Sequence, residues 1–155
     1  MGQIQETVDI KAPIDRVFAA LTDPSRASEW NPAVKNVQDL RAGPAQLGTQ
    51  WNQSAIVAGR PVSLVCRITE LKAPTYGVLE VSGDQNGKIT TQCSEIDGGT
   101  RVIQTLDFTP PGGIFGQVAG GMITNAIRRE MIRTMDRQRT IIEDESRAQS
   151  GSAAS

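Results

Sequence analysis

Hydrophobic and polar positions in the first part of the chain change from a strand pattern to a helix pattern. Apolar residues at positions 4, 8 and 10 share one parity, which predicts a half-buried strand within residues 3–12. Pro13 then suits the first position of a helix in which apolar side chains recur three and four residues apart up to Leu21. Asp23 and Pro24 are typical of the start of a second, short helix.

Strand and turn patterns alternate from residue 34 to residue 109. Clusters of glycine, proline and asparagine, which favour turns, recur about every ten residues between segments of strand-like composition. Regular spacing of this kind predicts antiparallel strands joined in chain order. The expected strands lie within residues 34–43, 48–61, 62–71, 73–83, 88–99 and 100–111.

The last apolar pattern predicts a long helix that ends near Glu145. Its apolar residues recur every four positions and form a sloping band, which suits a helix lying diagonally across a twisted sheet. The order of elements predicts an α+β domain over residues 1–145, in which a curved seven-stranded antiparallel sheet wraps around the C-terminal helix. The small, polar residues 146–155 predict a disordered tail.

The absence of histidine among the 155 residues limits the chemistry more than any other feature of composition. It excludes histidine-based catalytic triads and metal sites, and no cofactor or metal is expected. Cys66 and Cys93 lack a CxxC spacing and fit buried thiols in a reducing cytoplasm, the expected location. The net charge is −1, and no segment reads as a membrane span or a signal peptide. No nucleic-acid partner is therefore expected.

Two segments of the chain resemble a known superfamily. Residues 8–37, "VDIKAPIDRVFAALTDPSRASEWNPAVKNV", combine a strand, an Ala-Pro helix start, an Asp-Pro stop and a Trp near a Pro. Residues 98–113, "GGTRVIQTLDFTPPGG", have the form of a last strand leading into a final helix. This pattern, from about Gln3 to Glu143, resembles START-like (SRPBCC) domains, and within them the polyketide cyclase/dehydrase-like group. The resemblance implies the helix-grip fold, a large internal apolar cavity, and ligands such as lipids, sterols, hormones or polyketides.

The resemblance also implies that apolar side chains line the cavity. Trp30 is the strongest candidate, because similar proteins line their cavities between the second helix and the next strand. Any one of these side chains could instead be plain core, and methionine fills ordinary gaps as readily as it contacts ligands. The expected lining residues are Phe18, Leu21, Trp30, Val34, Trp51, Phe115, Ala119, Met122 and Met135.

Four polar residues share a strand parity with apolar neighbours. If they point inward they need partners, because an unpaired buried polar group costs about 1–3 kcal/mol; an edge strand or an outward parity is the alternative. Gln53 and Gln104 are candidates for ligand contact, while Glu6 and Glu80 are candidates for acid–base chemistry through a raised pKa. With two possible stabilisers of negative charge, the candidate catalytic set is Glu6, Glu80, Tyr76 and Arg67.

Glycines at positions 112, 113, 116, 120 and 121 weaken the front of the last helix by about 1 kcal/mol each relative to alanine. In the implied fold they would leave space at the cavity mouth and let the segment move. Close packing of helix on sheet, or fraying, is the alternative, and a GxxxG dimer face is the least favoured because arginines follow.

Five arginines crowd the same helix among several acidic residues. They predict either a solvated helix face or transient contact with an anionic membrane surface. These residues are Arg128, Arg129, Arg133, Arg137 and Arg139.

Two main functions fit these features. The first is a binding module that holds a hydrophobic or amphipathic small molecule in the cavity, as a carrier or sensor. The second is a polyketide aromatase/cyclase or dehydrase that moves protons with Glu or Tyr. A partner-binding accessory protein, with residues 57–62 as a mobile loop, is a third interpretation. The sequence leaves the oligomeric state, monomer or homodimer, open.

Overall fold

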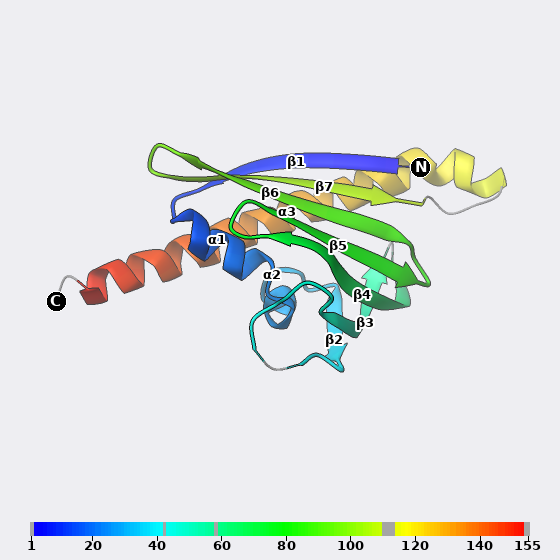
Figure 1. The fold of residues 1–155 in the computed structure, drawn as a ribbon. Coiled ribbons are helices and arrows are strands. Elements are labelled where there is room, and N and C mark those ends of the chain that lie inside the picture. Colours follow the sequence, from blue (N-terminus) through cyan, green and yellow to red (C-terminus); the bar gives the residue numbers. More distant parts are fainter. Residues whose placement is uncertain (1, 42, 58, 110–113, 154–155) are drawn as a thin grey trace.

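The computed structural model describes residues 2–41, 43–57, 59–109 and 114–153; the side chains of residues 57, 114–120 and 151–153 are outside that description. One antiparallel sheet of seven strands carries a long helix on one side, with short helices after the first strand (Figure 1). In chain order the elements are β1 (Gly2–Ile10), α1 (Ile14–Leu21), η1 (Pro24–Arg26), α2 (Ala27–Trp30), β2 (Val34–Gln38), β3 (Gln50–Val57), β4 (Arg60–Lys72), β5 (Tyr76–Gly83), β6 (Gly87–Ile96), β7 (Gly99–Phe108) and α3 (Ile114–Ala153).

The strands follow the order β1-β7-β6-β5-β4-β3-β2, so the sheet is open, with β1 and β2 at its edges. Register irregularities between Val34 and Asn36 and between Ile68 and Glu70 interrupt the ladders of β2–β3 and β4–β5. Such bulges bend a strand and increase its twist. This architecture confirms the predicted helix-grip fold and the predicted number of strands.

Strand limits differ from the sequence prediction mainly around β2 and the loop after it. The strand expected over residues 34–43 ends at Gln38, and Asp39 takes a positive φ of 62°. An L-residue in that conformation cannot continue a strand, and aspartate tolerates it better than most. The turn between β3 and β4 falls at Gly59, whose φ is 79°, and Pro61 belongs to β4 rather than to the turn.

Helix α3 extends beyond the sheet at both ends in Figure 1, and its C-terminal end contradicts the sequence prediction. It does not stop near Glu145 but continues to Ala153, so residues 146–153 are helical rather than a disordered tail. Side chains at this end of α3 contact the first part of the chain. The Glu143 carboxylate accepts a hydrogen bond from the Lys11 backbone N–H at 2.9 Å, and the Arg16 guanidinium donates to the Gln149 side chain.

The core consists of two clusters. The first joins α1 and α2 to β1, β7 and the later part of α3, through residues such as Val17, Trp30 and Ile142. The second lies on β3 and β4, around Trp51 and Cys66. Both cysteines are buried and free, as predicted, and burial raises the pKa of the Cys66 thiol to about 12 and that of Cys93 to about 11.

The glycine-rich front of α3 is only partly within the described residues. Gly112 and Gly113 lie outside them, and the surroundings of Gly116 and Gly120 are not described. At Gly121 a Cβ atom would meet no atom within 4 Å, so close packing does not explain that glycine. The adjacent Met122 is 77% exposed.

Candidate ligand-binding pocket

A pocket of about 200 Å³ lies where the two core clusters approach each other, between the η1–α2 segment, the sheet and α3. Apolar and aromatic side chains form most of its wall, and a smaller number of polar groups reach it. The lining residues are Leu21, Thr22, Asp23, Pro24, Ala27, Trp30, Asn31, Val34, Trp51, Gln53, Ile68, Glu70, Leu71, Gly77, Val78, Leu79, Ile89, Thr91, Gln104, Thr134 and Gln138.

The helical wall of the pocket starts at a capped turn. The Asp23 carboxylate accepts hydrogen bonds from the Ser25 backbone N–H at 3.0 Å and from the Ser25 hydroxyl at 2.6 Å, with Pro24 at the first position of η1. A side-chain acceptor at this position satisfies a backbone donor that the helix itself leaves free. The cap therefore fixes the start of the segment that carries Trp30.

Two arginines hold Trp30 against α3. The Arg26 guanidinium lies 5.1 Å from the centroid of the Trp30 ring, and Arg137 donates a hydrogen bond to the Trp30 carbonyl at 3.1 Å. Arg26 also pairs with Glu29 and Glu145, each at 2.8 Å. The hydrogen bonds with Glu29, and then with Glu145, raise the pKa of Arg26 above its usual range, so its charge persists at any ordinary pH.

On the sheet wall of the pocket, two glutamine side chains each form a hydrogen bond with a neighbouring side chain. The Trp51 indole N–H donates to Gln53 Oε1 at 2.9 Å, which satisfies both groups. Gln104 on β7 and Thr91 on β6 face each other in the strand register, and Gln104 Nε2 donates to Thr91 Oγ1 at 3.4 Å. That second bond is longer than the usual 2.7–3.2 Å.

The α3 wall contributes Thr134 and Gln138, one turn apart. Gln138 is 5% exposed, and its Oε1 atom has no hydrogen-bond partner among the described residues. It lies between Met135 and Ile142 on the buried stripe of the helix. A carboxamide thus occupies a position where helical spacing would place an apolar residue.

Six of the predicted ligand-contact residues line this pocket: Leu21, Trp30, Val34, Trp51, Gln53 and Gln104. Their role in binding stays a prediction. Phe18 and Met135 are buried in the core but do not line the described pocket, and Met122 points to solvent, because the front of α3 extends past the sheet. The side chains of Phe115 and Ala119 lie outside the described residues.

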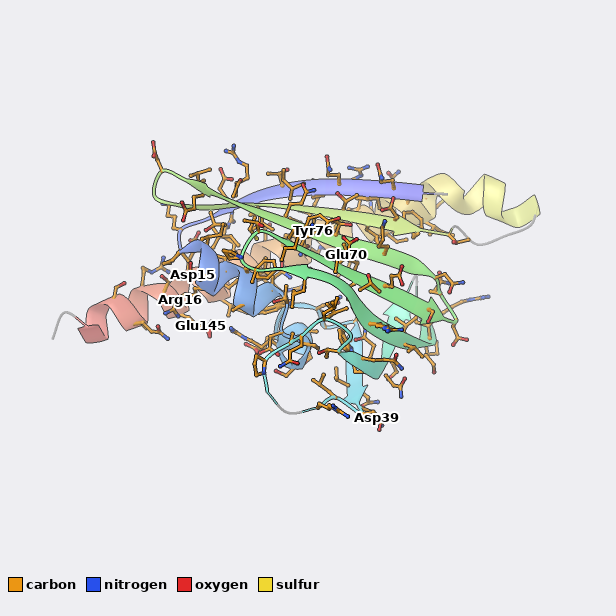
Figure 2. The ribbon with its side chains drawn as sticks, viewed as in Figure 1. Asp15, Arg16, Asp39, Glu70, Tyr76 and Glu145 are labelled. Carbon is orange, nitrogen blue, oxygen red and sulfur yellow. The ribbon has the colours of Figure 1, made fainter. Side chains whose placement is uncertain are left out.

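The predicted catalytic residues do not come together. Glu6 does lie on the inward parity of β1, but it forms an ion pair with Arg128 of α3 at 2.8 Å. Arg67 and Glu80 are exposed partners in the β4–β5 register. Tyr76 lies beside Glu70 on the sheet (Figure 2), and desolvation, followed by the charge of Glu70, raises its pKa. Within the described wall of the pocket, none of the four predicted catalytic residues occurs.

Sequence reasoning missed Thr91, Thr134 and Gln138. The signal for Thr91 is its place between Ile89 and Cys93 on the inward parity of β6. The signal for Gln138 is its helical spacing of three from Met135 and four from Ile142, the same kind of mismatch that had singled out Gln104 on a strand.

The arginines of α3 are largely paired with carboxylates. Arg133 and Arg137 lie 3.5 and 3.7 Å from Glu130, and Arg139 lies 3.3 Å from Asp136. These contacts fit the solvated-face interpretation, while contact with a membrane surface stays a prediction.

Neither a metal centre nor a membrane-spanning helix is found in the part of the chain that the structure describes. No group of three or more Cys, Asp or Glu side chains there could hold a metal ion. None of the helices in the same ranges has a segment long and apolar enough to cross a membrane.

Comparison with protein families gives a match over residues 1–143, to a family described as polyketide cyclase / dehydrase and lipid transport. The chain belongs to this family. The earlier resemblance is thereby confirmed. A comparison with curated protein sequences found no match.

Solved structures with the same fold include two bacterial proteins. TTHA0849 from Thermus thermophilus superposes with a TM-score of 0.80 at 18% identity, covering 94% of this chain and 99% of that one. The Zhui aromatase/cyclase from Streptomyces sp. R1128 superposes with a TM-score of 0.75 at 18% identity, covering 92% and 93%. A third, Ara h 8.0201, has a TM-score of 0.65 at 13% identity, covering 91% and 97%. At these identities the likeness establishes the fold alone.

Proposed function

We propose that this protein binds a compact, mainly apolar small molecule in the pocket between η1–α2, the sheet and α3, as a carrier or sensor. The observation that carries the proposal is the wall of the pocket. Two tryptophans and nine aliphatic or proline side chains form more than half of it, and polar groups come from the segment after α1, from the sheet and from α3. This combination is typical of small-molecule sites, in which apolar contact supplies affinity and a few polar groups fix orientation.

The volume of the pocket limits the size of the ligand. Drug-sized ligands occupy sites of about 300–1,000 Å³, and this pocket measures about 200 Å³. A ring compound or a short branched chain suits this volume, whereas a sterol or long acyl chain requires the η1–α2 segment or α3 to move outward. The family description, which includes lipid transport, supports binding of an apolar molecule.

Native mass spectrometry of the protein purified from its own host, followed by organic extraction, tests the proposal. We expect a bound compound of low polarity. A variant that fills the pocket sharpens the test: Thr134→Phe places a ring on the pocket wall, and Thr140→Phe, on the exposed face of α3, is the matched control. Thr134→Phe should purify empty, and Thr140→Phe should retain the compound.

An empty protein that also fails to take up any apolar fluorescent dye would refute the proposal. Tryptophan fluorescence measures this binding directly, because Trp30 and Trp51 are the two tryptophans of the chain and both line the pocket. Quenching or a shift of the intrinsic fluorescence therefore reports on the pocket itself.

The second candidate function is catalysis on a polyketide-like substrate. The family description and the structural likeness to an aromatase/cyclase favour it. The carboxylates at the pocket are Asp23 and Glu70, rather than the predicted Glu6 and Glu80, so acid–base chemistry there would use a different pair. Recovery of a chemically altered compound after incubation with the protein distinguishes an enzyme from a carrier.

A further inference from the structure

The side chain of Gln104 on β7 contains an acceptor that is both accessible and without a protein partner. Its Nε2 atom donates to Thr91 Oγ1, while its Oε1 atom forms no hydrogen bond with any described residue. Among the described residues, Gln138 Oε1 is the one side-chain oxygen or nitrogen that has neither a partner nor accessible surface. Gln104 Oε1 therefore retains accessible surface, although Gln104 as a whole is only 9% exposed.

The position of Gln104 in the sheet determines where that surface opens. In the strand register Gln104 lies between Glu6 of β1 and Thr91 of β6, so neighbouring strands cover it on both sides. Its side chain shares the inward parity of the buried Val102. Helix α3 crosses this face of the sheet, since Arg128 of α3 pairs with Glu6. The space that Gln104 borders there is the pocket that it lines, and Oε1 opens onto it.

The hydroxyl of Thr91 places a donor beside this acceptor. Thr91 Oγ1 accepts the Gln104 N–H at 3.4 Å, so its own proton must point elsewhere, and no described residue accepts it. Thr91 is 7% exposed and lines the same pocket. The two side chains thus form one polar site on the sheet, with an unused acceptor and an unused donor next to each other.

The pair defines the chemical group that it can bind. An amide oxygen only accepts hydrogen bonds, so a ketone, ether or ester oxygen of a ligand cannot satisfy Gln104 Oε1. A hydroxyl group satisfies both members, because it can donate to Gln104 Oε1 and accept from the Thr91 hydroxyl.

The rest of the sheet wall is apolar and sets the character of the remainder of the ligand. Ile89, Leu79 and Ile68 line the pocket on the successive strands β6, β5 and β4, on the way to Trp51 on β3. None of the described residues that line the pocket is lysine or arginine. A ligand carboxylate would therefore lose its hydration without gaining a counter-charge, which is strongly unfavourable.

We infer that the ligand of this pocket is an uncharged, mainly apolar molecule whose hydroxyl group binds the Gln104–Thr91 pair, donating a hydrogen bond to Gln104 Oε1. The inference rests on the proposed function, because it specifies the chemistry and the orientation of the molecule that the pocket binds. It assigns Gln104 as the residue that selects a hydroxylated ligand over the equivalent hydrocarbon.

The test compares 4-ethylphenol, 4-ethyltoluene and 4-ethylanisole, which share a ring and differ in one substituent. The first offers a donor, the second no polar group, and the third only an acceptor. Binding is followed through the two tryptophan indole N–H signals in a ¹H–¹⁵N NMR titration, since both tryptophans line the pocket. The variant is Gln104→Met, which keeps a long unbranched side chain. Gln92→Met, at an exposed position of β6, is the matched control.

The informative quantity is the ratio of the 4-ethyltoluene and 4-ethylphenol dissociation constants within each protein. Comparing ratios between proteins cancels the greater hydrophobicity of 4-ethyltoluene, as in a double-mutant cycle. We expect this ratio to be about fivefold larger in the wild type and in Gln92→Met than in Gln104→Met, the effect of one hydrogen bond. The affinity for 4-ethylanisole relative to 4-ethyltoluene should not depend on residue 104, and 4-ethylbenzoate should bind more weakly than 4-ethylphenol.

Several outcomes overturn the inference while the proposed function stands: an equal ratio in all three proteins, a preference for 4-ethylanisole that depends on Gln104, or tightest binding of 4-ethylbenzoate by the wild type. If none of the four compounds moves the indole signals of the wild-type protein, the proposed function fails together with the inference. Gln104→Leu serves as a second variant if Gln104→Met loses its native circular dichroism.

Discussion

Replacing Gln138 with methionine should make the protein more stable when no ligand is added. The wild-type side chain keeps Oε1 buried without a partner among the described residues, and leaving such an acceptor unsatisfied costs about 1–3 kcal/mol. Methionine removes the acceptor, has nearly the same length, and is as good a helix former as glutamine. Imperfect repacking offsets part of the gain, so we expect the free energy of unfolding to rise by about 1 kcal/mol.

Urea denaturation followed by far-ultraviolet circular dichroism measures this change. With a slope of about 1–3 kcal/mol per molar urea, the midpoint should increase by roughly 0.5 M at an unchanged slope. The melting temperature should increase by about 2–4 °C, as expected for a protein of this size. Gln92→Met makes the same chemical change at an exposed position and should leave both midpoints within error.

A loss of stability in Gln138→Met would refute the reasoning, because it would mean that an ordered water already satisfies the carboxamide in the unliganded pocket.

Two further predictions concern the thiols and the contact between α2 and α3. Burial raises the pKa of Cys66 to about 12 and that of Cys93 to about 11, from an ordinary value near 9. Neither thiol should therefore react with a disulfide reagent at pH 8 until urea unfolds the chain. The free energy of unfolding should decrease as the pH rises above about 9, because only the thiols of the unfolded chain then lose protons. Rapid labelling of the native protein would contradict this prediction. Glu145→Gln should lower the melting temperature by about 2 °C, because it weakens a partly exposed ion pair with Arg26 that is worth at most about 1 kcal/mol. The control, Asp144→Asn, alters an ion pair within α3 itself and should change the melting temperature less.

The fold could be predicted from the sequence because its signals are local and repeated. Turn residues recur between the strands, and consecutive antiparallel strands need no long crossover, so chain order nearly determines sheet order. The sequence prediction is wrong where contacts between distant parts of the chain determine the structure. Beyond Glu145, α3 contacts Arg16, which lies more than a hundred residues away in the sequence, and no local pattern near Glu145 shows that this partner exists.

The site could be predicted only in part, for a related physical reason. Parity and spacing indicate which face of an element a residue occupies, and this sufficed for Gln53 and Gln104, while the family resemblance pointed to Trp30. Parity and spacing do not indicate which side chain lies opposite a residue across the core. Glu6 lies on the inward parity as expected, but Arg128 of α3 neutralises it, so an inward carboxylate became an ion pair instead of an acid–base group.

The polar residues of the pocket occur together at one place in the core, and this grouping itself argues for a ligand. Thr91, Gln104 and Gln138 come from three different elements, and each is more than nine-tenths buried. Thr91 and Gln104 hydrogen-bond to each other across β6 and β7, whereas Gln138 comes from α3. Apolar residues at these positions would join the two clusters into one continuous core. The free-energy cost of burying these polar groups is offset if they hydrogen-bond to a common partner. The gap between the clusters therefore supports the proposal that the protein binds a small molecule there.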